Sequence, residues 1–451
     1  MNHSHSINFG IIPKSLKDSV IKPGDASYER VKSTFFRGGA PGIILQVKNA
    51  EQIVAALELV RAHPHLPLGI RSGGHGISGR STNDGGIIID LSHMNKIEIL
   101  DRSARRVRIE PGARWMDVAA ALAPYGWALT SGDHGGVGVG GLATSGGIGL
   151  FARAYGLTID HLRAVEIVLA DRSVVRASEQ ENQDLFWAVR GAGANFGMVT
   201  SFEFQVDQVG NVGWAQLILD ASDIAGFLQK WGASLEDSPR DLTSFLIINP
   251  PRQSQPAIAH VMAVVNSDDQ TTIRNRLQPI TEIAPVYDLQ VVVTPYASIL
   301  ANSQGGVHNA QGEPVSRSGS LEHITPEFAA AAAGLIHSGV TYFFQIRSMG
   351  GAISDVPVEA TAFGSRSANF EVTAAGTNQE RLNAAWDNMY QHFSGLYLNF
   401  DTDLRPERLK DAFPPKTLER LRKLKSRYDP DNVFRDNFNI VPQVKKSGHH
   451  E

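Results

Sequence analysis

Three glycine-rich runs, two of which hold histidines, are the residues of this chain best suited to chemistry. They read RSGGHGISG (residues 71–79), GDHGGVGVGGLATSGGIG (residues 132–149) and RGAGANFG (residues 190–197). Glycine lets the backbone approach a ligand closely and lets successive N–H groups point into an anion. Any one run is also typical of a surface turn. Together they indicate a large phosphorylated ligand that is contacted from several sides.

The second run contains Gly138, Gly140 and Ala143 at the spacing of the dinucleotide-binding fingerprint. That fingerprint needs an apolar strand directly before it and a helix directly after it. The residues that precede it, TSGDHGG, are not typical of a strand. The spacing alone therefore does not predict a Rossmann site for NAD.

Short strands and helices alternate around these runs and must position them. Strands are predicted at residues 43–47, 85–91 and 105–112, and helices at 50–63 and 115–122. Residues 162–178 are predicted to form two strands joined at Asp171 and Arg172. Residues 185–206 are predicted to form a helix, a glycine loop and a strand. Longer helices follow at residues 224–235, 272–283, 379–393 and 416–428, with strands at 259–266 and 341–349 and loops at 249–256 and 301–312.

Length and composition narrow the class of protein. The 451 residues exceed one ordinary core, so two or more structural units are expected. A net charge of −4 argues against nucleic acid or an anionic membrane as the main partner. The absence of cysteine excludes disulfides, thiolate nucleophiles and iron–sulfur clusters. No signal peptide or membrane span is evident, which predicts a cytoplasmic protein.

The ordered motifs resemble one family. RSGGHGISG, DGGIIIDLSHMNKIEI, VRIEPGARWMDV, GVGVGGLATSGGIG, YGLTIDHL, LFWAVRGAGANFG and the C-terminal RYDPDNVFRDNFNI are similar to the berberine-bridge-enzyme-like branch of the vanillyl-alcohol-oxidase flavoproteins. The likeness spans residues 40–210 and 395–442, and the middle of the chain matches loosely.

The resemblance implies an α+β fold. A PCMH-type FAD-binding domain of two α+β subdomains is expected at residues 1–210. A substrate domain with an antiparallel sheet flanked by helices is expected at residues 211–405. Residues 406–451 are expected to return to the FAD-binding domain.

The resemblance also implies how FAD is held. The histidine of the R-x-G-G-H motif, which bonds to the 8α-methyl group of the flavin in this family, corresponds to His75. Many members add a cysteine link three residues before the VGVGG-type run, where this chain has His134. A single histidyl link is therefore expected, as in singly linked amine oxidases of the branch. His134 either fills space over the pyrimidine side of the ring or acts in catalysis.

The matching motif positions are expected to contact FAD. Val137 corresponds to a gatekeeper for dioxygen, and the alternative for it is an ordinary core valine. Asn437 and Asn439 are expected near the pyrimidine edge, although loop asparagines also serve as turn formers. The cofactor residues implied in this way are Arg71, Ser72, Gly73, Gly74, His75, Gly76, Gly79, Val137, Gly138, Gly140, Gly141, Thr144, Ser145, Gly146, Gly147, Gly149, Gly197, Val199, Asn437 and Asn439.

Two segments of the second half are expected to face the substrate. Alternation in TYFFQIRSMGG places Gln345 and Arg347 on one face of a strand, where they either meet substrate or face solvent. GLYLNFDTDL resembles the family's Y-x-N-Y motif and makes Tyr397 the candidate base or orienting group. A packed aromatic residue is the alternative for Tyr397. A free tyrosine has a pKa of about 10, so a base role needs a nearby cation such as Arg347.

The resulting hypothesis is an FAD-dependent oxidase of a small molecule that bears an amine, alcohol or hemiacetal. Hydride passes to flavin N5, and O2 accepts the electrons to give H2O2. The alternatives are a flavin-dependent oxidative cyclase or dehydrogenase and a non-catalytic flavin-fold binding protein. The histidines lack the spacing of a metal site, so no metal is expected. The sequence leaves the substrate and the oligomeric state open.

Overall fold

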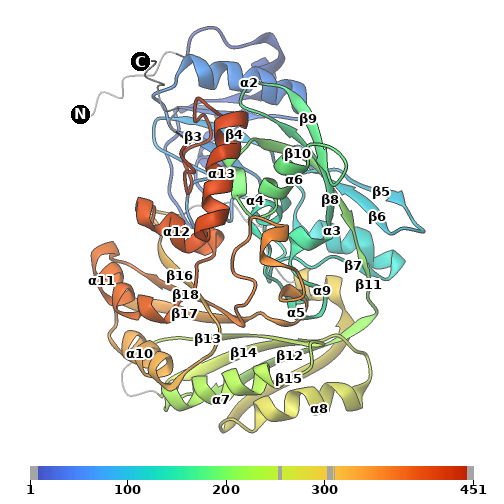
Figure 1. Cartoon of the computed structure of the whole chain (residues 1–451), viewed down its shortest axis with the longest axis vertical. Helices are drawn as coiled ribbons and strands as arrows, with labels where there is room; N and C mark the ends of the chain where they lie inside the picture. Colours follow the sequence, from blue (N-terminus) through green and yellow to red (C-terminus); the bar gives the residue numbers. More distant parts are fainter. Residues whose placement is uncertain (1–8, 252–255, 302–307, 309, 444–451) are drawn as a thin grey trace, which may run out of the picture.

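The computed structural model describes residues 9–251, 256–301, 308 and 310–443. In Figure 1 the sheets of the first half of the chain lie above one broad sheet, and helices cover the lower face of that sheet. Within the described residues, the strands form sheets of four, five, two and seven members.

The four-stranded sheet has the order β1-β2-β4-β3, with β2 and β3 both parallel to β4. Its members are β1 (Val20–Ile21), β2 (Ile43–Gln46), β3 (Leu68–Arg71) and β4 (Ile87–Asp90). The run Ile87, Ile88, Ile89 is at most 1% exposed, as expected for a central parallel strand that is covered on both faces. α2 (Ala50–Ala62) begins at Asn49, whose side chain accepts a hydrogen bond from the Gln52 amide.

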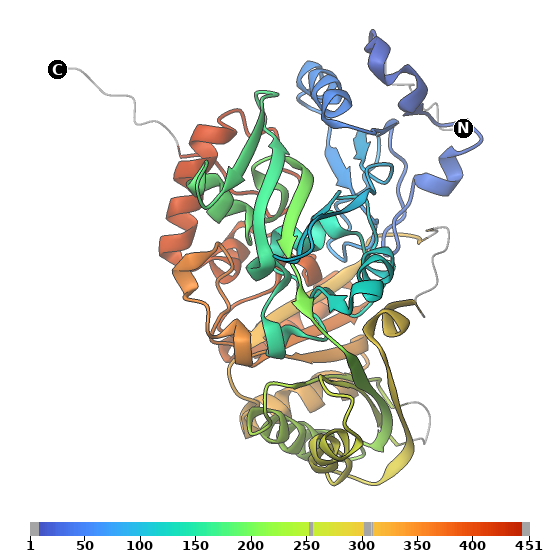
Figure 2. The same ribbon diagram turned by 90° about the vertical axis from the view of Figure 1, so that its right-hand side faces the viewer.

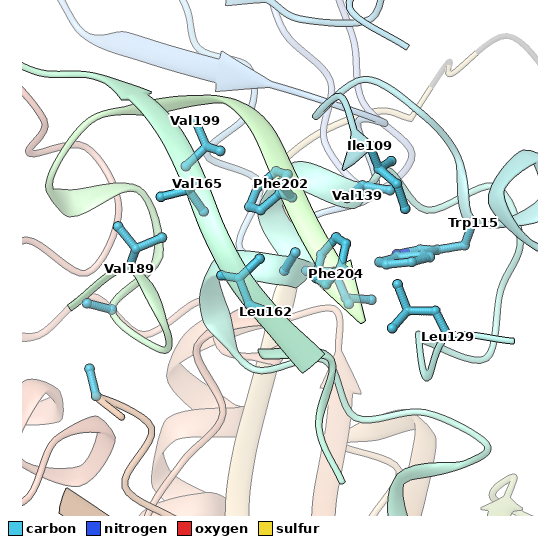
Figure 3. Close-up of a cluster of buried hydrophobic side chains, with 14 of the residues drawn as sticks. Ile109, Trp115, Leu129, Val139, Leu162, Val165, Val189, Val199, Phe202 and Phe204 are labelled. Atoms are coloured by element: carbon cyan, nitrogen blue, oxygen red, sulfur yellow. The ribbon is translucent and has the colours of Figure 1, made fainter. Parts of the chain in front are cut away.

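The five-stranded sheet is antiparallel and has the order β5-β6-β10-β8-β9. Its members are β5 (Ile97–Asp101), β6 (Arg106–Ile109), β8 (Leu162–Val168), β9 (Val174–Ser178) and β10 (Met198–Gln205). Phe202 and Phe204 extend from β10 into a core that also contains Trp115 and Val139, as Figure 3 shows. This core joins α3 (Trp115–Leu122) and α6 (Gln183–Val189) to the sheet.

The seven-stranded sheet is antiparallel throughout and has the order β15-β12-β14-β13-β17-β18-β16. Its members are β12 (Asn211–Asp220), β13 (Leu242–Ile248), β14 (Ile258–Val265), β15 (Val286–Pro295), β16 (Val315–Leu321), β17 (Thr341–Ser348) and β18 (Phe370–Gly376). Its outer face is covered by α7 (Ile224–Glu236), α8 (Gln270–Thr281), α10 (Pro326–His337) and α11 (Gln379–Met389). Side chains of its other face, such as Phe245 and Val264, join the core of the five-stranded sheet.

Short elements complete the described chain. β7 (Trp127–Ala128) pairs with β11 (Asp207–Gln208). The short helices are α1 (Tyr28–Val31), α4 (Val139–Ser145), α5 (Ala152–Tyr155), α9 (Tyr296–Ala301) and α12 (Leu409–Ala412). Turns of 3₁₀ helix occur at Lys14–Ser19, Ala123–Tyr125, Thr158–His161, Gly193–Asn195, Gly351–Ile353, Val358–Ala360, Tyr390–His392, Leu398–Phe400 and Pro406–Arg408.

The C-terminal part of the chain packs against the first half. It enters through α13 (Pro415–Tyr428), which lies beside the upper sheets in Figure 1. The Lys425 ammonium group, fully buried, donates hydrogen bonds to the carbonyl oxygens of Asn195 (2.6 Å) and Phe434 (2.7 Å) and pairs with Asp429 (2.7 Å). Asn195 in turn accepts a hydrogen bond from the Ile440 amide (3.0 Å).

The predicted α+β class is confirmed, including the antiparallel sheet flanked by helices. The helix at α2 and the strand pair β8 and β9 lie where the sequence predicts them, with Arg172 at a positive φ of 75° in the connecting turn. α8 begins two residues before the predicted start at Thr272, because Asp269 caps it. The predicted loop at 249–256 lies partly outside the described residues, as does the one at 301–312. The predicted domain boundaries at residues 210 and 405 stay predictions.

Candidate functional site

One open cleft brings most of the predicted cofactor residues together. It is lined by all three glycine-rich runs, by the turn at residues 397–400 and by residues 434–438 of the C-terminal part. The predicted residues that line it are Ser72, Gly73, Gly74, His75, Gly76, Val137, Gly138, Gly140, Gly141, Thr144, Ser145, Gly197, Val199, Tyr397 and Asn437.

The first two glycine-rich runs cross backbone to backbone within this cleft. A Cβ atom on Gly73 would lie 2.3 Å from the Gly138 nitrogen, and one on Gly138 would lie 2.2 Å from the Gly73 nitrogen. Ser72 holds the crossing, because its hydroxyl donates to the Pro111 carbonyl and accepts from the Gly140 amide at 3.3 Å. We call residues 72–76 and 137–141 the glycine cradle. Its shape requires a residue without a Cβ atom at positions 73 and 138.

His75 lies in the glycine cradle, within a cluster of aromatic rings. Its ring stacks on Phe35 at 4.6 Å and lies 5.0 Å from the ring of His134 and 5.1 Å from that of His308. Burial, followed by the neighbouring histidines, lowers the pKa of His75 to about 3. The imidazole is therefore neutral at physiological pH, and a neutral imidazole nitrogen has a lone pair free to form a bond.

His134 is held beside His75. Its Nδ1 accepts a hydrogen bond from the Gly136 amide at 3.1 Å, which leaves the proton on Nε2. The ring is tilted by 39° to that of His75. The space-filling role and the catalytic role of His134 both stay predictions.

Several predicted cofactor residues lie behind the walls of the cleft. Arg71 is buried in an ion pair with Asp90 at 2.7 Å. Gly79 closes a turn beside Arg37 and Pro314. A Cβ atom on Gly149 would lie 1.4 Å from the Ser131 carbonyl oxygen, so this glycine allows a close packing contact. The Asn439 Oδ1 atom is buried and has no hydrogen-bond partner among the described residues.

Gly146 and Gly147 position Tyr397 rather than forming the cleft wall. A Cβ atom on Gly146 would lie 3.1 Å from the Tyr397 ring. The Gly147 amide donates to the Tyr397 phenolic oxygen at 3.0 Å, and Asn399 Nδ2 donates to the same atom at 2.8 Å. Burial raises the pKa of Tyr397 to about 12. At neutral pH the phenol thus keeps its proton, and two protein donors already occupy the oxygen.

The segment that carries Tyr397 ends in a tight turn. Residues Leu398–Phe400 form a 3₁₀ turn after Tyr397, and the Tyr397 amide donates to Ser318 Oγ at 2.8 Å. The turn places the Tyr397 phenol and the Asn399 amide on one side, where they meet. A regular strand would not bring residues two apart to a mutual hydrogen bond, since their side chains stand parallel.

The predicted alternation along β17 is confirmed. Phe344 and Ile346 are fully buried in the helix-covered core, and Tyr342 is 57% exposed at the start of the strand. Gln345 and Arg347 lie on the opposite face and are buried at 3% and 5% exposure. The solvent-facing alternative for these two residues is therefore wrong.

Arg347 is held by two carboxylates, and we call these three residues the Arg347 cluster. Its guanidinium donates to Glu371 at 3.1 Å and to Asp133 at 3.2 Å. It also lies 4.1 Å from the centre of the Phe400 ring. Asp133 and Phe400 both line the cleft. Arg347 is the cation predicted to activate Tyr397, and its positive charge is thus largely neutralised by Glu371 and Asp133.

Glu371 is fully buried on β18, beside Arg347 in the strand register. Desolvation raises its pKa, although Arg347 and a hydrogen bond from Thr373 Oγ1 at 2.7 Å act in the opposite direction. Neither Glu371 nor Asp133 is found by motif reasoning. The sequence feature that could have identified Glu371 is that it is the single charged residue in the strand FEVTAAG. A charge in a buried strand requires a partner, so it indicates a buried ion pair.

Two classes of feature are not found in the part of the chain that the structure describes. No cluster of three histidine or acidic residues there has the geometry to hold a metal ion. None of the helices there combines the length and apolar character that crossing a membrane requires.

Comparison with known proteins matches both ends of the chain to family models. Residues 41–178 match the FAD binding domain, and residues 396–441 match the family described as berberine and berberine like. The chain is 27% identical over 465 residues to (R)-6-hydroxynicotine oxidase of Paenarthrobacter nicotinovorans, which covers 96% of this chain and 98% of that protein.

Solved structures share the fold over nearly the whole chain. The crystal structure of 6-hydroxy-D-nicotine oxidase from Arthrobacter nicotinovorans has a TM-score of 0.83 at 25% identity and covers 94% of this chain and 98% of that one. The glucooligosaccharide oxidase of Acremonium strictum, with a 6-S-cysteinyl, 8α-N1-histidyl FAD, has a TM-score of 0.80 at 22% identity and covers 94% and 97%.

Proposed function

The chain belongs to the berberine-bridge-enzyme-like branch of the PCMH-type FAD-linked oxidoreductases, and from this premise we propose that it is an FAD-dependent oxidase of a small organic molecule. The substrate bears an amine, an alcohol or a hemiacetal. Its C–H bond loses hydride, and O2 accepts the electrons to give H2O2. The relatives named above oxidise 6-hydroxynicotine and glucooligosaccharides, and both are small molecules.

The observation that carries the proposal is the arrangement of one cleft, which is lined both by the glycine cradle with His75 and by Tyr397. The residues fit FAD. The glycine cradle exposes backbone in the way that a pyrophosphate needs, and the neutral His75 faces the same space. When bound, FAD supplies the two-electron acceptor that hydride removal requires.

His75 is the proposed single covalent anchor. One imidazole nitrogen, in the neutral form that burial maintains, would replace a hydrogen on the 8α carbon of FAD. The 8α C–H bond would break, its electron pair would reduce the flavin, and O2, the acceptor proposed above, would take the two electrons to give H2O2. The glucooligosaccharide oxidase carries an additional cysteinyl bond. This chain has no cysteine, so a second bond of that kind cannot form.

Tyr397 is proposed to orient the substrate. Because its oxygen already accepts hydrogen bonds from Gly147 and Asn399, its own O–H hydrogen is directed elsewhere. That hydrogen can be donated to the amine nitrogen or the oxygen of a substrate in the cleft. The same two donors stabilise a phenolate, so Tyr397 becomes a base as pH approaches its raised pKa of about 12. Gln345 and the Arg347 cluster are proposed to set the polarity of the wall behind it.

Val137 is the proposed gatekeeper for dioxygen. It lines the cleft beside the glycine cradle, and its side chain is half-buried. A small residue at this point leaves a path for O2 that a bulky one would close. This role supports an oxidase over a strict dehydrogenase.

Acid precipitation tests the covalent anchor. We expect the yellow colour of the wild type to remain with the precipitated protein. His75→Ala should release all of its flavin into the supernatant, and the matched variant His134→Ala should retain it. A colourless wild-type pellet would contradict the histidyl link.

Peroxide formation with a panel of hydroxylated pyridine alkaloids, oligosaccharides and aromatic alcohols tests the reaction. We expect at least one member to give H2O2, and Tyr397→Phe to lower kcat by roughly 100-fold or more while flavin content is unchanged. Tyr155→Phe is the matched control, because the Tyr155 hydroxyl accepts from Asn266 outside the cleft. Flavin reduction by substrate without peroxide would show a dehydrogenase instead.

A further inference from the structure

The seven-stranded sheet ends at an edge strand that is exposed on both faces. β15 is ten residues long, pairs with β12 on one side and forms the margin of the sheet. In Figure 2 it runs along the outer margin of the lower half of the molecule and continues into α9. Its exposed apolar side chains are Val286, Tyr287, Leu289, Val291, Val292 and Val293, which are 39–53% exposed.

The other long edges in the described residues are protected. β16, at the opposite margin of the same sheet, is buried along nearly its whole length. β9 carries Arg176, and β5 carries Glu98 and Asp101. Charges, short length or a cover are the usual means of preventing edge-to-edge pairing. β15 contains a single charged residue, Asp288, and is otherwise open.

We infer that β15 is the interface with a second copy of this chain, joined edge to edge about a two-fold axis. Two copies related by such an axis present their β15 strands antiparallel, which continues the antiparallel order of the sheet. The unpaired N–H and C=O groups of one strand then bond to those of the other.

The sequence of β15 is complementary to itself in this arrangement. With the axis at Gln290, Leu289 lies opposite Val291 of the second copy, and Tyr287 lies opposite Val293. Asp288 lies opposite Val292, so no like charges face each other. The four residues Tyr287, Leu289, Val291 and Val293 alternate along the strand and share one face. They would form a continuous apolar strip across the junction, since each pairs with another member of the set.

The expected affinity is modest. A stable interface buries about 800 Å² on each partner, which is more than a single strand provides. We therefore expect a dissociation constant of roughly 1 µM, with dimer above and monomer below that concentration.

Sedimentation of the flavin-loaded protein between about 0.1 and 100 µM tests the inference, with the range set around the expected dissociation constant. The wild type should move from the 48.9 kDa of one chain toward twice that mass as its concentration rises. Val291→Lys should weaken the dimer by roughly 100-fold, because a charge is forced into the apolar strip. Val174→Lys, at an exposed valine on the edge strand β9, is the matched control and should leave the dimer intact.

A cysteine at residue 290 provides an independent test. The chain has no cysteine, so Gln290→Cys creates a single thiol. Directly opposed residues of antiparallel strands have Cα atoms about 4.5–5.5 Å apart, within the span of a disulfide. Oxidation should give a cross-linked dimer that Val291→Lys suppresses.

Three results would overturn the inference. One is a wild type that stays monomeric at the highest concentration. Another is a dimer that survives Val291→Lys while Gln290→Cys fails to cross-link, since the interface would then lie elsewhere. The third is backbone amides of residues 286–295 that gain protection from hydrogen exchange only when a different protein is added.

Discussion

The glycine cradle and the Arg347 cluster lie at the same cleft but are built from opposite materials. The cradle is made of backbone, and its essential contact is the approach of Gly73 to the Gly138 nitrogen. The Arg347 cluster is made of charged side chains that come from distant segments, Asp133 from the second glycine-rich run and Glu371 from β18.

The two regions differ in the kind of substitution that they tolerate. A site built from backbone fails when a side chain is added, because no neighbouring atom can move away. A cluster of buried charges fails when a side chain is removed, because the remaining charges lose their partner. Substitutions in the two regions should therefore give opposite patterns of sensitivity.

Removal of Arg347 is expected to have the largest effect. Arg347→Met leaves Glu371 buried without its cation, which should lower the free energy of unfolding by about 3–5 kcal/mol at pH 8. The pKa of Glu371 is already raised in the folded protein and would rise further. A carboxyl group whose pKa is higher in the folded than in the unfolded protein stabilises the fold fully at pH values below its unfolded pKa. This stabilisation is lost as the pH rises toward the folded pKa. The deficit of the variant should thus grow from pH 4 to pH 8.

Urea unfolding at several pH values measures this deficit. Glu371→Gln in the Arg347→Met background should restore most of the stability at pH 8 and flatten the pH profile. An equal deficit at pH 4 and pH 8 would mean that Glu371 is not the group left without a partner.

Addition of one methyl group to the glycine cradle should be nearly as harmful. The Cβ atom of Gly138→Ala would lie 2.2 Å from the Gly73 nitrogen. We expect this overlap to lower the free energy of unfolding by about 3 kcal/mol and to cause loss of the bound flavin. Gly334→Ala is the matched control, because its Cβ atom meets nothing within 4 Å in α10. That control should be neutral or slightly stabilising. Thermal unfolding and the flavin-to-protein absorbance ratio provide the two measurements.

The smallest effect comes from the same substitution made once beside each region, at a threonine that bonds to one of its residues. Thr373→Val removes the hydrogen bond to Glu371 and should cost about 1–2 kcal/mol. Thr144→Val removes bonds to the carbonyl oxygens of Gly140 and Gly141 within one short helix and should cost under about 0.5 kcal/mol. If Thr373→Val and Thr144→Val lowered the free energy of unfolding equally in denaturant, the two regions would not differ in their tolerance of side-chain removal.

The same difference explains what the sequence could predict. The glycine cradle could be predicted from the sequence, because close backbone contact restricts residues 73 and 138 to glycine. The long helices and alternating strands follow from periodicity, as at α2 and β17. Periodicity does not show which strands are neighbours, so the meeting of Asp133 with Arg347 could not be predicted. The turn at Leu398–Phe400 was missed because its geometry depends on contacts such as that with Ser318.

The return of the C-terminal segment has a consequence for how the protein is made. Residues 434–438 form part of the cleft wall, and Lys425 and Asn195 fasten this segment to the third glycine-rich run. During translation the first two glycine-rich runs emerge long before that wall exists. The nascent chain therefore presents an incomplete cleft until residues 434–438 leave the ribosome. We therefore expect cofactor loading to follow translation, and chains that stop before residue 430 to lack this part of the cleft wall.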